Sequence, residues 1–238
     1  MLTRPRAHPV ALATACVLLL VLAAACGSGS SSSAAAGAPP ATTPSYKITV
    51  AGDSISVGLG ASLRGVVGDT AVVKVIGEQG TGLARPDTFD WPKRLTELAR
   101  DFPPQVLVFS VGSNDAQDLV DANGKVVAAA TNNTAWDAEY SRRLAASFDA
   151  FANSSTKVVW VGHVRTKEDR VGLANRHVHQ LATAVAASRP FVTVTDLATM
   201  LGTGEQKADR CLIADGLHLS VPCLDEAAKA LDTQMPAR

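Results

Sequence analysis

The sequence predicts an α/β domain in which helices cover both faces of a mostly parallel sheet. Five short runs rich in β-branched residues alternate along the chain with segments that carry apolar residues at spacings of three and four. The third and fourth of these runs are almost continuously apolar, as expected for strands that are buried on both faces. This alternation is typical of a three-layer α/β/α sandwich, here with five strands.

The predicted elements follow one another at regular intervals from Tyr46 onward. The strands are expected at residues 47–51, 71–76, 105–111, 157–161 and 191–196. The helices are expected in the Gly-spaced apolar segment after the first strand and at residues 91–101, 135–152, 168–188 and 224–231.

Residues 117–134 break this rhythm, because they have no clear period and contain Asn123-Gly124. A connection of this length is usually functional or mobile. We therefore consider two interpretations of the segment, a lid beside the active site and a surface excursion without a function.

The first 45 residues are not part of the predicted domain. Two arginines precede an almost wholly apolar run at residues 10–25, which is typical of a secretory signal and slightly short for a membrane span. The run ends in Ala-Ala-Ala-Cys26, which resembles the lipobox of bacterial lipoproteins, although alanine stands where leucine is more usual. We expect residues 1–26 to direct export and Cys26 to be lipidated. Cleavage and release of a soluble protein is the alternative.

Residues 27–45 are rich in Ser, Ala, Gly and Pro and carry no charge. Because such a composition cannot bury enough apolar surface to fold, we predict a flexible tether followed by one folded domain at residues 46–238. The protein is then expected to face outward at the cell membrane, or to be secreted if Cys26 is not lipidated.

The charge balance gives no reason to expect a nucleic-acid partner. The chain has 22 basic and 22 acidic residues, and removal of the first 25 residues, with their two arginines and no acid, would leave a charge of −2. The sequence also contains no basic patch with interleaved aromatic residues. Membrane contact is expected only through the lipid anchor.

Several polar or glycine-containing groups follow predicted strands, where a parallel sheet brings them to one edge. They are Gly52-Asp53-Ser54, Gly80-Thr81-Gly82, Gly112-Ser113-Asn114-Asp115 and, just before the last helix, Asp215-Gly216-Leu217-His218. Taken singly, each has a structural explanation, such as a helix cap, a turn, or a surface histidine beside a capping aspartate. Their order along the chain, with a nucleophile, donors, and then an acid and a base, is that of one active site.

The joint pattern resembles the SGNH hydrolases, the GDSL-type esterases and lipases, whose blocks supply Ser, Gly, Asn and an Asp-x-x-His pair. The segment from Gly82 to Trp91, together with Trp136 and Tyr140, is similar to an exported bacterial branch of uncharacterised function, the DUF459 family. The resemblance spans residues 46–231 and implies an SGNH or flavodoxin-like sandwich.

The resemblance and the residues imply the same chemistry, a serine esterase. Ser54 would attack an ester carbonyl, His218 would carry the proton, and Asp215 would hold the imidazole. The backbone N–H groups of Ser54 and Gly82 and the amide of Asn114 would stabilise the oxyanion. No metal and no cofactor are expected.

Two other functions stay open at this point. An O-acyltransferase acting on cell-envelope carbohydrate would use the same acyl-enzyme, and a non-catalytic glycan-binding envelope lipoprotein would use the same scaffold. The expected ligand is accordingly a small ester or an acylated glycan.

Three further residues are candidates for substrate contact. Arg85, His163 and Arg165 follow predicted strands, and surface ion pairing is the alternative for the arginines. We expect Asp53 to be a structural hydrogen-bond acceptor.

Cys211 and Cys223 bracket the Asp-His pair. In an exported protein we expect them to form a disulfide, with two separately buried thiols as the alternative.

Overall fold

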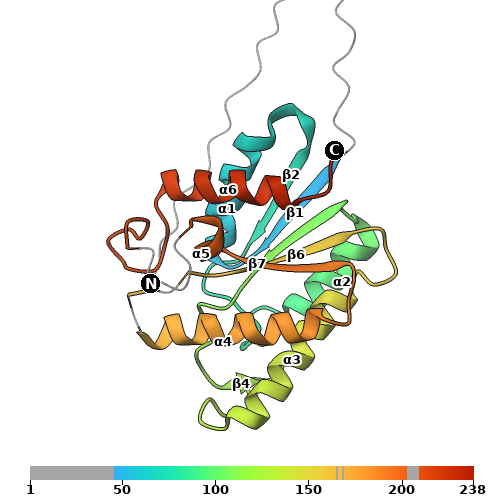
Figure 1. Ribbon diagram of the computed structural model, residues 1–238. Coiled ribbons are helices and arrows are strands. Elements are labelled where there is room, and N and C mark those ends of the chain that lie inside the picture. The colour runs from blue at the N-terminus through green and yellow to red at the C-terminus, as the bar shows by residue number, and fades with distance from the viewer. Residues whose placement is uncertain (1–45, 165, 168, 203–208) are drawn as a thin grey trace, which may run out of the picture. The chain divides into compact units, whose positions relative to one another are not determined.

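Five parallel strands form the central sheet of the protein (Figure 1). The computed structural model describes residues 46–164, 166, 167, 169–202 and 209–238, so the expected signal, Cys26, the tether and Arg165 lie outside the described residues. The strands are β1 (Lys47–Gly52), β2 (Val72–Gly77), β3 (Val106–Ser110), β6 (Lys157–Gly162) and β7 (Val192–Asp196). Their order in the sheet is β2-β1-β3-β6-β7. The predicted five-stranded parallel sheet is confirmed.

Helices cover both faces of this sheet, which gives the predicted three layers (Figure 1). One face carries α1 (Ser54–Val67), the short α5 (Leu197–Met200) and α6 (Val221–Gln234). The other face carries α2 (Trp91–Asp101), α3 (Asn133–Asp149) and α4 (Asp169–Ala186). A 3-10 turn, η1 (Gly68–Thr70), links α1 to β2.

The central strands are apolar on both sides because each side meets a layer of helices. Alternate residues of β1, β3 and β6 enter different cores: Val50, Val108 and Val161 pack toward α1 and α6, and Ala51, Phe109 and Trp160 pack toward α2, α3 and α4. All six are at most 2% exposed. This burial explains why the period-two alternation of a half-buried strand is missing from β3 and β6.

Residues 117–134 contain regular structure that the sequence did not indicate. β4 (Leu119–Val120) and β5 (Val126–Ala128) form an antiparallel ribbon, and α3 begins at Asn133 with Asn132 as its N-cap. Strands of two and three residues are too short to give a recognisable period. The two interpretations of the segment, a lid and a surface excursion, both stay predictions.

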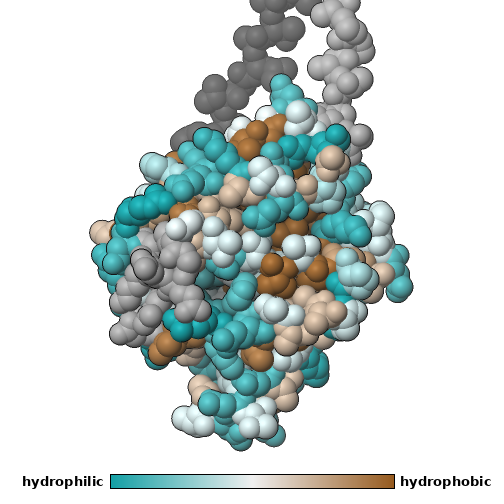
Figure 2. Space-filling view, in the orientation of Figure 1, coloured by the Kyte–Doolittle hydropathy of each residue, from teal (hydrophilic) through white to brown (hydrophobic). Residues whose placement is uncertain are grey.

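The face seen in Figure 2 carries hydrophobic side chains only in small clusters, which hydrophilic residues separate. Isolated apolar side chains such as Phe102, at 69% exposure, are usual on protein surfaces. Within the described ranges, no helix has the length and hydrophobicity needed to cross a membrane.

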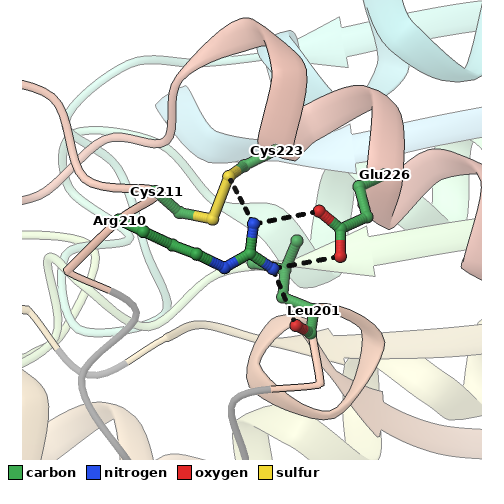
Figure 3. Close-up of a disulfide and its surroundings, with 5 residues drawn as sticks. All are labelled: Leu201, Arg210, Cys211, Cys223 and Glu226. Atoms are coloured by element: carbon green, nitrogen blue, oxygen red, sulfur yellow. Dashed lines mark hydrogen bonds and ion pairs between the residues drawn. A yellow bond between two sulfur atoms is a disulfide. The ribbon is translucent and has the colours of Figure 1, made fainter.

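Cys211 and Cys223 form a disulfide, as expected, that joins the loop before α6 to the first turn of that helix (Figure 3). The guanidinium of Arg210 lies beside the Cys223 sulfur, pairs with Glu226 and donates to the carbonyl oxygen of Leu201. The bridge therefore fixes both ends of the short loop that carries Asp215 and His218.

Candidate active site

Ser54 is the first residue of α1, directly after the carboxyl end of β1. Asp53, in an extended conformation, is the N-cap of the helix, and its Oδ1 accepts the N–H of Ile55 at 3.0 Å. Because Asp53 supplies the cap, the hydroxyl of Ser54 is left for another partner.

Gly52 is required by the close packing of β1 against β3. Its φ is +141°, and a Cβ atom added there would lie 1.8 Å from the carbonyl oxygen of Ser110. Any side chain would force the two strands apart, so glycine holds the turn that presents Ser54.

Ser54, His218 and Asp215 form one hydrogen-bonded chain. The Oγ of Ser54 lies 2.8 Å from Nε2 of His218, and Nδ1 of His218 lies 2.7 Å from Oδ2 of Asp215. Because an ionised carboxylate only accepts hydrogen bonds, Nδ1 carries a proton and Nε2 accepts the Ser54 hydroxyl. The structure thus brings together the three residues that were predicted to form the triad.

The carboxylate of Asp215 is held by backbone donors and not by burial. Its Oδ1 accepts the N–H groups of His218 and Leu217, both at 2.9 Å. These backbone hydrogen bonds, from His218 and then from Leu217, lower the pKa of Asp215 to about 2. Its side chain is 44% exposed and that of His218 is 35% exposed, so this part of the site is open to water.

The predicted oxyanion donors lie in three neighbouring segments. The backbone N–H groups of Ser54 and Gly82 have no hydrogen-bond partner among the described residues. The amide nitrogen of Asn114 donates to the carbonyl oxygen of Thr81 at 2.9 Å and has a longer contact of 3.5 Å with Oδ2 of Asp53. The hydrogen bond to Thr81 joins the loop after β3 to the loop after β2. The second amide hydrogen of Asn114 has only the longer contact with Asp53.

Gly82 is a glycine because a buried carboxylate packs against it. A Cβ atom at Gly82 would lie 2.1 Å from Oδ1 of Asp115. The carboxylate of Asp115 accepts the N–H groups of Leu83 and Ala84 and the hydroxyl of Tyr140, at 3.1, 2.8 and 2.7 Å. Asp115 therefore fixes the course of the chain directly after the predicted donor.

Arg143 supports the same loop, and the sequence analysis did not identify it. Its guanidinium is buried and donates to the carbonyl oxygens of Leu83 and Val120, at 2.7 and 2.6 Å. Trp136 and Tyr140 stack on the same side of α3, with ring centroids 4.6 Å apart. The sequence feature that could have identified Arg143 is the spacing of residues 136, 140 and 143, which places this arginine on the apolar face of the helix.

His163 was predicted to contact substrate, and this prediction is wrong. Its side chain is 2% exposed, with Nε2 2.9 Å from Oγ of Ser110 and Nδ1 2.6 Å from Oγ of Ser113. Since the Ser110 hydroxyl donates to the Val161 carbonyl at 2.8 Å, it accepts a hydrogen bond from Nε2–H of His163. Burial lowers the pKa of His163 to about 3, and the nearby imidazole of His218 acts in the same direction to a smaller extent. His163 is thus a neutral residue inside the protein.

Asp53 lies next to His163, with 3.7 Å between Oδ1 of the carboxyl and Nε2 of the imidazole. Burial raises the pKa of Asp53 well above its usual value, although the hydrogen bond from Ile55 acts in the opposite direction. Its contacts are those of a structural acceptor, as predicted.

Residues 47–216 match the model of a family described as a protein of unknown function, DUF459. The chain belongs to the DUF459 family. The match includes Asp215 and ends two residues before His218.

The fold of this DUF459 protein is that of the SGNH hydrolases. It is similar to a proposed SGNH hydrolase from Slackia heliotrinireducens, with 20% identity, a TM-score of 0.58 and coverage of 80% of this chain and 99% of the other. It is also similar to a member of the lipolytic G-D-S-L family from Veillonella parvula, with 18% identity, a TM-score of 0.55 and coverage of 80% of this chain and 100% of the other. A third similar structure is that of the acetylxylan esterase Axe2 from Geobacillus stearothermophilus, with 14% identity, a TM-score of 0.56 and coverage of 80% of this chain and 94% of the other. No curated protein sequence matches the chain.

Arg85 of the DUF459 protein is engaged with Asp87. Its Nε and Nη2 atoms donate to the two carboxylate oxygens of Asp87, at 2.9 and 2.6 Å, and its side chain is 42% exposed. Contact of Arg85 with substrate stays a prediction, as does that of Arg165.

The described part of the DUF459 protein contains no group of three or more His, Cys, Asp or Glu residues placed to hold a metal ion. Two histidines of α4 have different neighbours. Nε2 of His177 lies 2.6 Å from Oδ1 of Asp137, whereas Nε2 of His179 lies 3.9 Å from Oδ2 of Asp196.

Two clefts adjoin the loops that carry the predicted oxyanion donors. A cleft of about 440 Å³ has Gly82 in its wall, together with Phe89, Glu139 and Arg142. A cleft of about 280 Å³ runs from residues 115–117 to α3 and α4. Residues of the 117–134 segment line both clefts. The interpretation of this segment as a lid stays a prediction. Neither cleft is lined by Ser54 or His218.

Proposed function

We propose that this DUF459 protein is a serine esterase that cleaves O-acyl esters through an acyl-enzyme. One observation carries the proposal: the imidazole of His218 is bonded at one nitrogen to Ser54 and at the other to Asp215, at 2.8 and 2.7 Å. This arrangement activates a serine hydroxyl as a nucleophile.

In the first half of the reaction, Oγ of Ser54 attacks the carbonyl carbon of the ester. Nε2 of His218 takes the hydroxyl proton, and Asp215 stabilises the resulting imidazolium. The negative oxygen of the tetrahedral intermediate is stabilised by the N–H groups of Ser54 and Gly82 and the amide of Asn114. When the intermediate collapses, the bond to the alcohol oxygen breaks, and His218 returns the proton to the leaving alcohol.

In the second half, a water molecule attacks the acyl group on Ser54 while His218 accepts a proton from that water. Collapse of the second intermediate releases the carboxylic acid and regenerates the Ser54 hydroxyl. If the hydroxyl of a sugar attacks in place of water, the same steps transfer the acyl group, so the alternative of an O-acyltransferase uses the same residues.

The proposal is tested by labelling the purified domain with a fluorophosphonate and by measuring turnover of p-nitrophenyl acetate. We expect one label per chain, on the peptide that contains Ser54, and no label or turnover in Ser54→Ala. Ser113→Ala is the sharpest control for the site of labelling, because Ser113 is also a serine paired with a histidine, at 2.6 Å from Nδ1 of His163.

Turnover that persists in Ser54→Ala contradicts the mechanism. A wild-type protein that neither reacts with the fluorophosphonate nor hydrolyses any ester contradicts the enzyme and favours the glycan-binding alternative.

We also propose that the protein is exported and that Cys26 is lipidated. The apolar segment before Cys26 supports this proposal, and so does the disulfide between Cys211 and Cys223, since such bridges persist in oxidising compartments. Cells fed labelled palmitate should label the wild-type protein and not Cys26→Ala. Equal labelling of both proteins would refute the lipid anchor.

A further inference from the structure

Asp53 is fully buried, and most of its polar atoms are bound within the turn between β1 and α1. Its backbone N–H donates to the carbonyl oxygen of Ser110 at 3.1 Å, and its own carbonyl oxygen accepts the N–H and the hydroxyl of Ser56 at 3.1 and 2.7 Å. Oδ1 accepts the N–H of Ile55 as the cap of the helix. These bonds fix the position of the remaining carboxyl oxygen, Oδ2.

Oδ2 of Asp53 faces the side-chain amide of Asn114. The Nδ2 atom of that amide lies between two oxygen atoms, 2.9 Å from the carbonyl oxygen of Thr81 and 3.5 Å from Oδ2 of Asp53. Because both neighbours can accept a hydrogen bond, the amide presents its nitrogen to them and not its oxygen. The Thr81 carbonyl takes one amide hydrogen, and Oδ2 faces the other.

The contact between Asp53 and Asn114 is long, which suits a hydrogen that has to serve a second acceptor. An N–H···O hydrogen bond is usually about 2.9–3.0 Å long, so a contact of 3.5 Å is weak. A developing oxyanion can therefore share this hydrogen at little cost. Burial raises the pKa of Asp53 well above its usual value, so its carboxyl group places less negative charge near an oxyanion than an exposed aspartate would.

The amide of Asn114 also connects the segments that carry the other predicted donors. Its two neighbours, Asp53 and Thr81, directly precede Ser54 and Gly82 in the chain. The orientation of one side-chain amide is thus tied to the positions of both backbone N–H groups that would stabilise the oxyanion.

We infer that Asp53 is a positioning residue for the proposed reaction, because its Oδ2 directs the side-chain amide of Asn114 toward the oxyanion. The inference rests on the proposed esterase function. It goes beyond capping of α1, which needs only Oδ1.

Asp53→Asn separates the two tasks of this carboxyl group. Asparagine has almost the same shape, and its Oδ1 can still accept the N–H of Ile55, so the cap is kept. The capping bond then leaves Nδ2 in the place of Oδ2. A carboxyl oxygen can accept a hydrogen bond whether or not the group carries a proton, whereas an amide nitrogen cannot. Two NH2 groups would face each other, and the amide of Asn114 would be displaced.

The kinetic test measures turnover of p-nitrophenyl acetate in a double-mutant cycle. We expect Asp53→Asn to lower kcat about tenfold with little change in KM. In the Asn114→Ala background the same change should have no further effect, because no amide is left to position. Damage to α1 or a displaced Ser54 would instead lower kcat by the same factor in both backgrounds.

Asp196→Asn is the matched control. Asp196 also ends a strand and caps a helix, but its Oδ1 accepts the N–H of Thr199 and its Oδ2 the hydroxyl of the same residue. That hydroxyl can equally accept from an amide, so kcat should be unchanged. If Asp53→Asn does not fold, Asp53→Ser keeps a capping oxygen and removes Oδ2, and its loss of kcat should likewise vanish in the Asn114→Ala background.

The NMR signals of the Asn114 side-chain amide give a reading that does not depend on turnover. They are assigned by their loss in Asn114→Ala. We expect them to shift in Asp53→Asn and to keep their positions in Asp196→Asn.

The two proposals fail in different ways. Shifted amide signals in a protein that turns over no ester support the contact and refute only the esterase. Turnover with an unchanged kcat in Asp53→Asn, or with equal losses in both backgrounds, overturns the positioning role and leaves the esterase in place. Amide signals that do not move in Asp53→Asn also overturn it.

Discussion

Replacement of His163 by glutamine is expected to change how the stability of the protein depends on pH. The imidazole of His163 is buried between Ser110 and Ser113, and burial lowers its pKa from 6.5 to about 3. Below pH 6.5 the unfolded chain takes up a proton at this residue, whereas the folded protein does not until about pH 3. The contribution of neutral His163 to stability is therefore complete above pH 6.5 and is lost as the pH falls through that window.

The size of the change in unfolding free energy follows from the difference between the pKa of His163 in the unfolded chain and its pKa in the folded protein. One pKa unit corresponds to about 1.4 kcal/mol, so the shift from 6.5 to about 3 gives a limit of about 5 kcal/mol at the acid end. Between pH 7 and pH 5 the expected loss of unfolding free energy is about 2 kcal/mol, because the unfolded state is by then mostly protonated at this position. His163→Gln removes this loss, although it lowers the stability at pH 7 by disturbing the buried hydrogen bonds.

Urea unfolding at several pH values between 7 and 5 measures the effect, provided that the m-value stays constant. The useful quantity is the difference between wild type and variant in the change of unfolding free energy with pH. Asp53 is buried with a raised pKa and acts with the opposite sign, but it is present in both proteins. His177→Gln is the matched control, since its imidazole is 43% exposed. Parallel pH dependences for wild type and His163→Gln would refute the assignment of His163 as a buried neutral residue.

Three further predictions concern the site and the loop around it. Asn114→Ala should lower kcat by about 10²–10³ without abolishing turnover, measured with p-nitrophenyl acetate; an unchanged kcat would remove Asn114 from the oxyanion hole. Gly82→Ala places a Cβ atom 2.1 Å from a buried carboxylate oxygen and should cost about 1–3 kcal/mol in urea unfolding, whereas Gly65→Ala meets nothing within 4 Å and should be neutral or stabilising; similar effects of the two changes would contradict the packing argument. Replacement of Cys211 and Cys223 together by serine opens a loop with a sequence separation of 12 and should lower the unfolding free energy by about 3 kcal/mol; a Tm equal to that of the wild type would show that the bridge does not constrain this loop.

The sequence was sufficient to place Ser54 next to Asp215 and His218 because the relations involved are local or topological. Asp215 and His218 are three residues apart in one turn, so their hydrogen bond depends on a short stretch of chain. Ser54 follows a strand, and parallel strands present their carboxyl ends at one edge of the sheet. Neither relation requires knowledge of side-chain packing.

The role of His163 could not be predicted because it depends on strand order. His163 directly follows β6, and its two hydrogen-bond partners come from the end of β3 and the loop after it. β3 and β6 are neighbours in the sheet although the ribbon and α3 separate them in the sequence. A residue after a strand faces either the substrate or the interior, and only the packing of the neighbouring loop decides which.

The structure divides the candidate site into an exposed part and a buried part with different tasks. The negative charge that the proposed reaction needs is on Asp215, which is 44% exposed and is stabilised by backbone N–H groups in a loop closed by a disulfide. The position of the predicted oxyanion donors is instead set inside the protein, where Asp115 and Arg143 bind the loop after β2. Because the buried groups touch no reacting atom, changes in them should lower kcat by displacing Gly82 and Asn114, and not by removing charge from the triad.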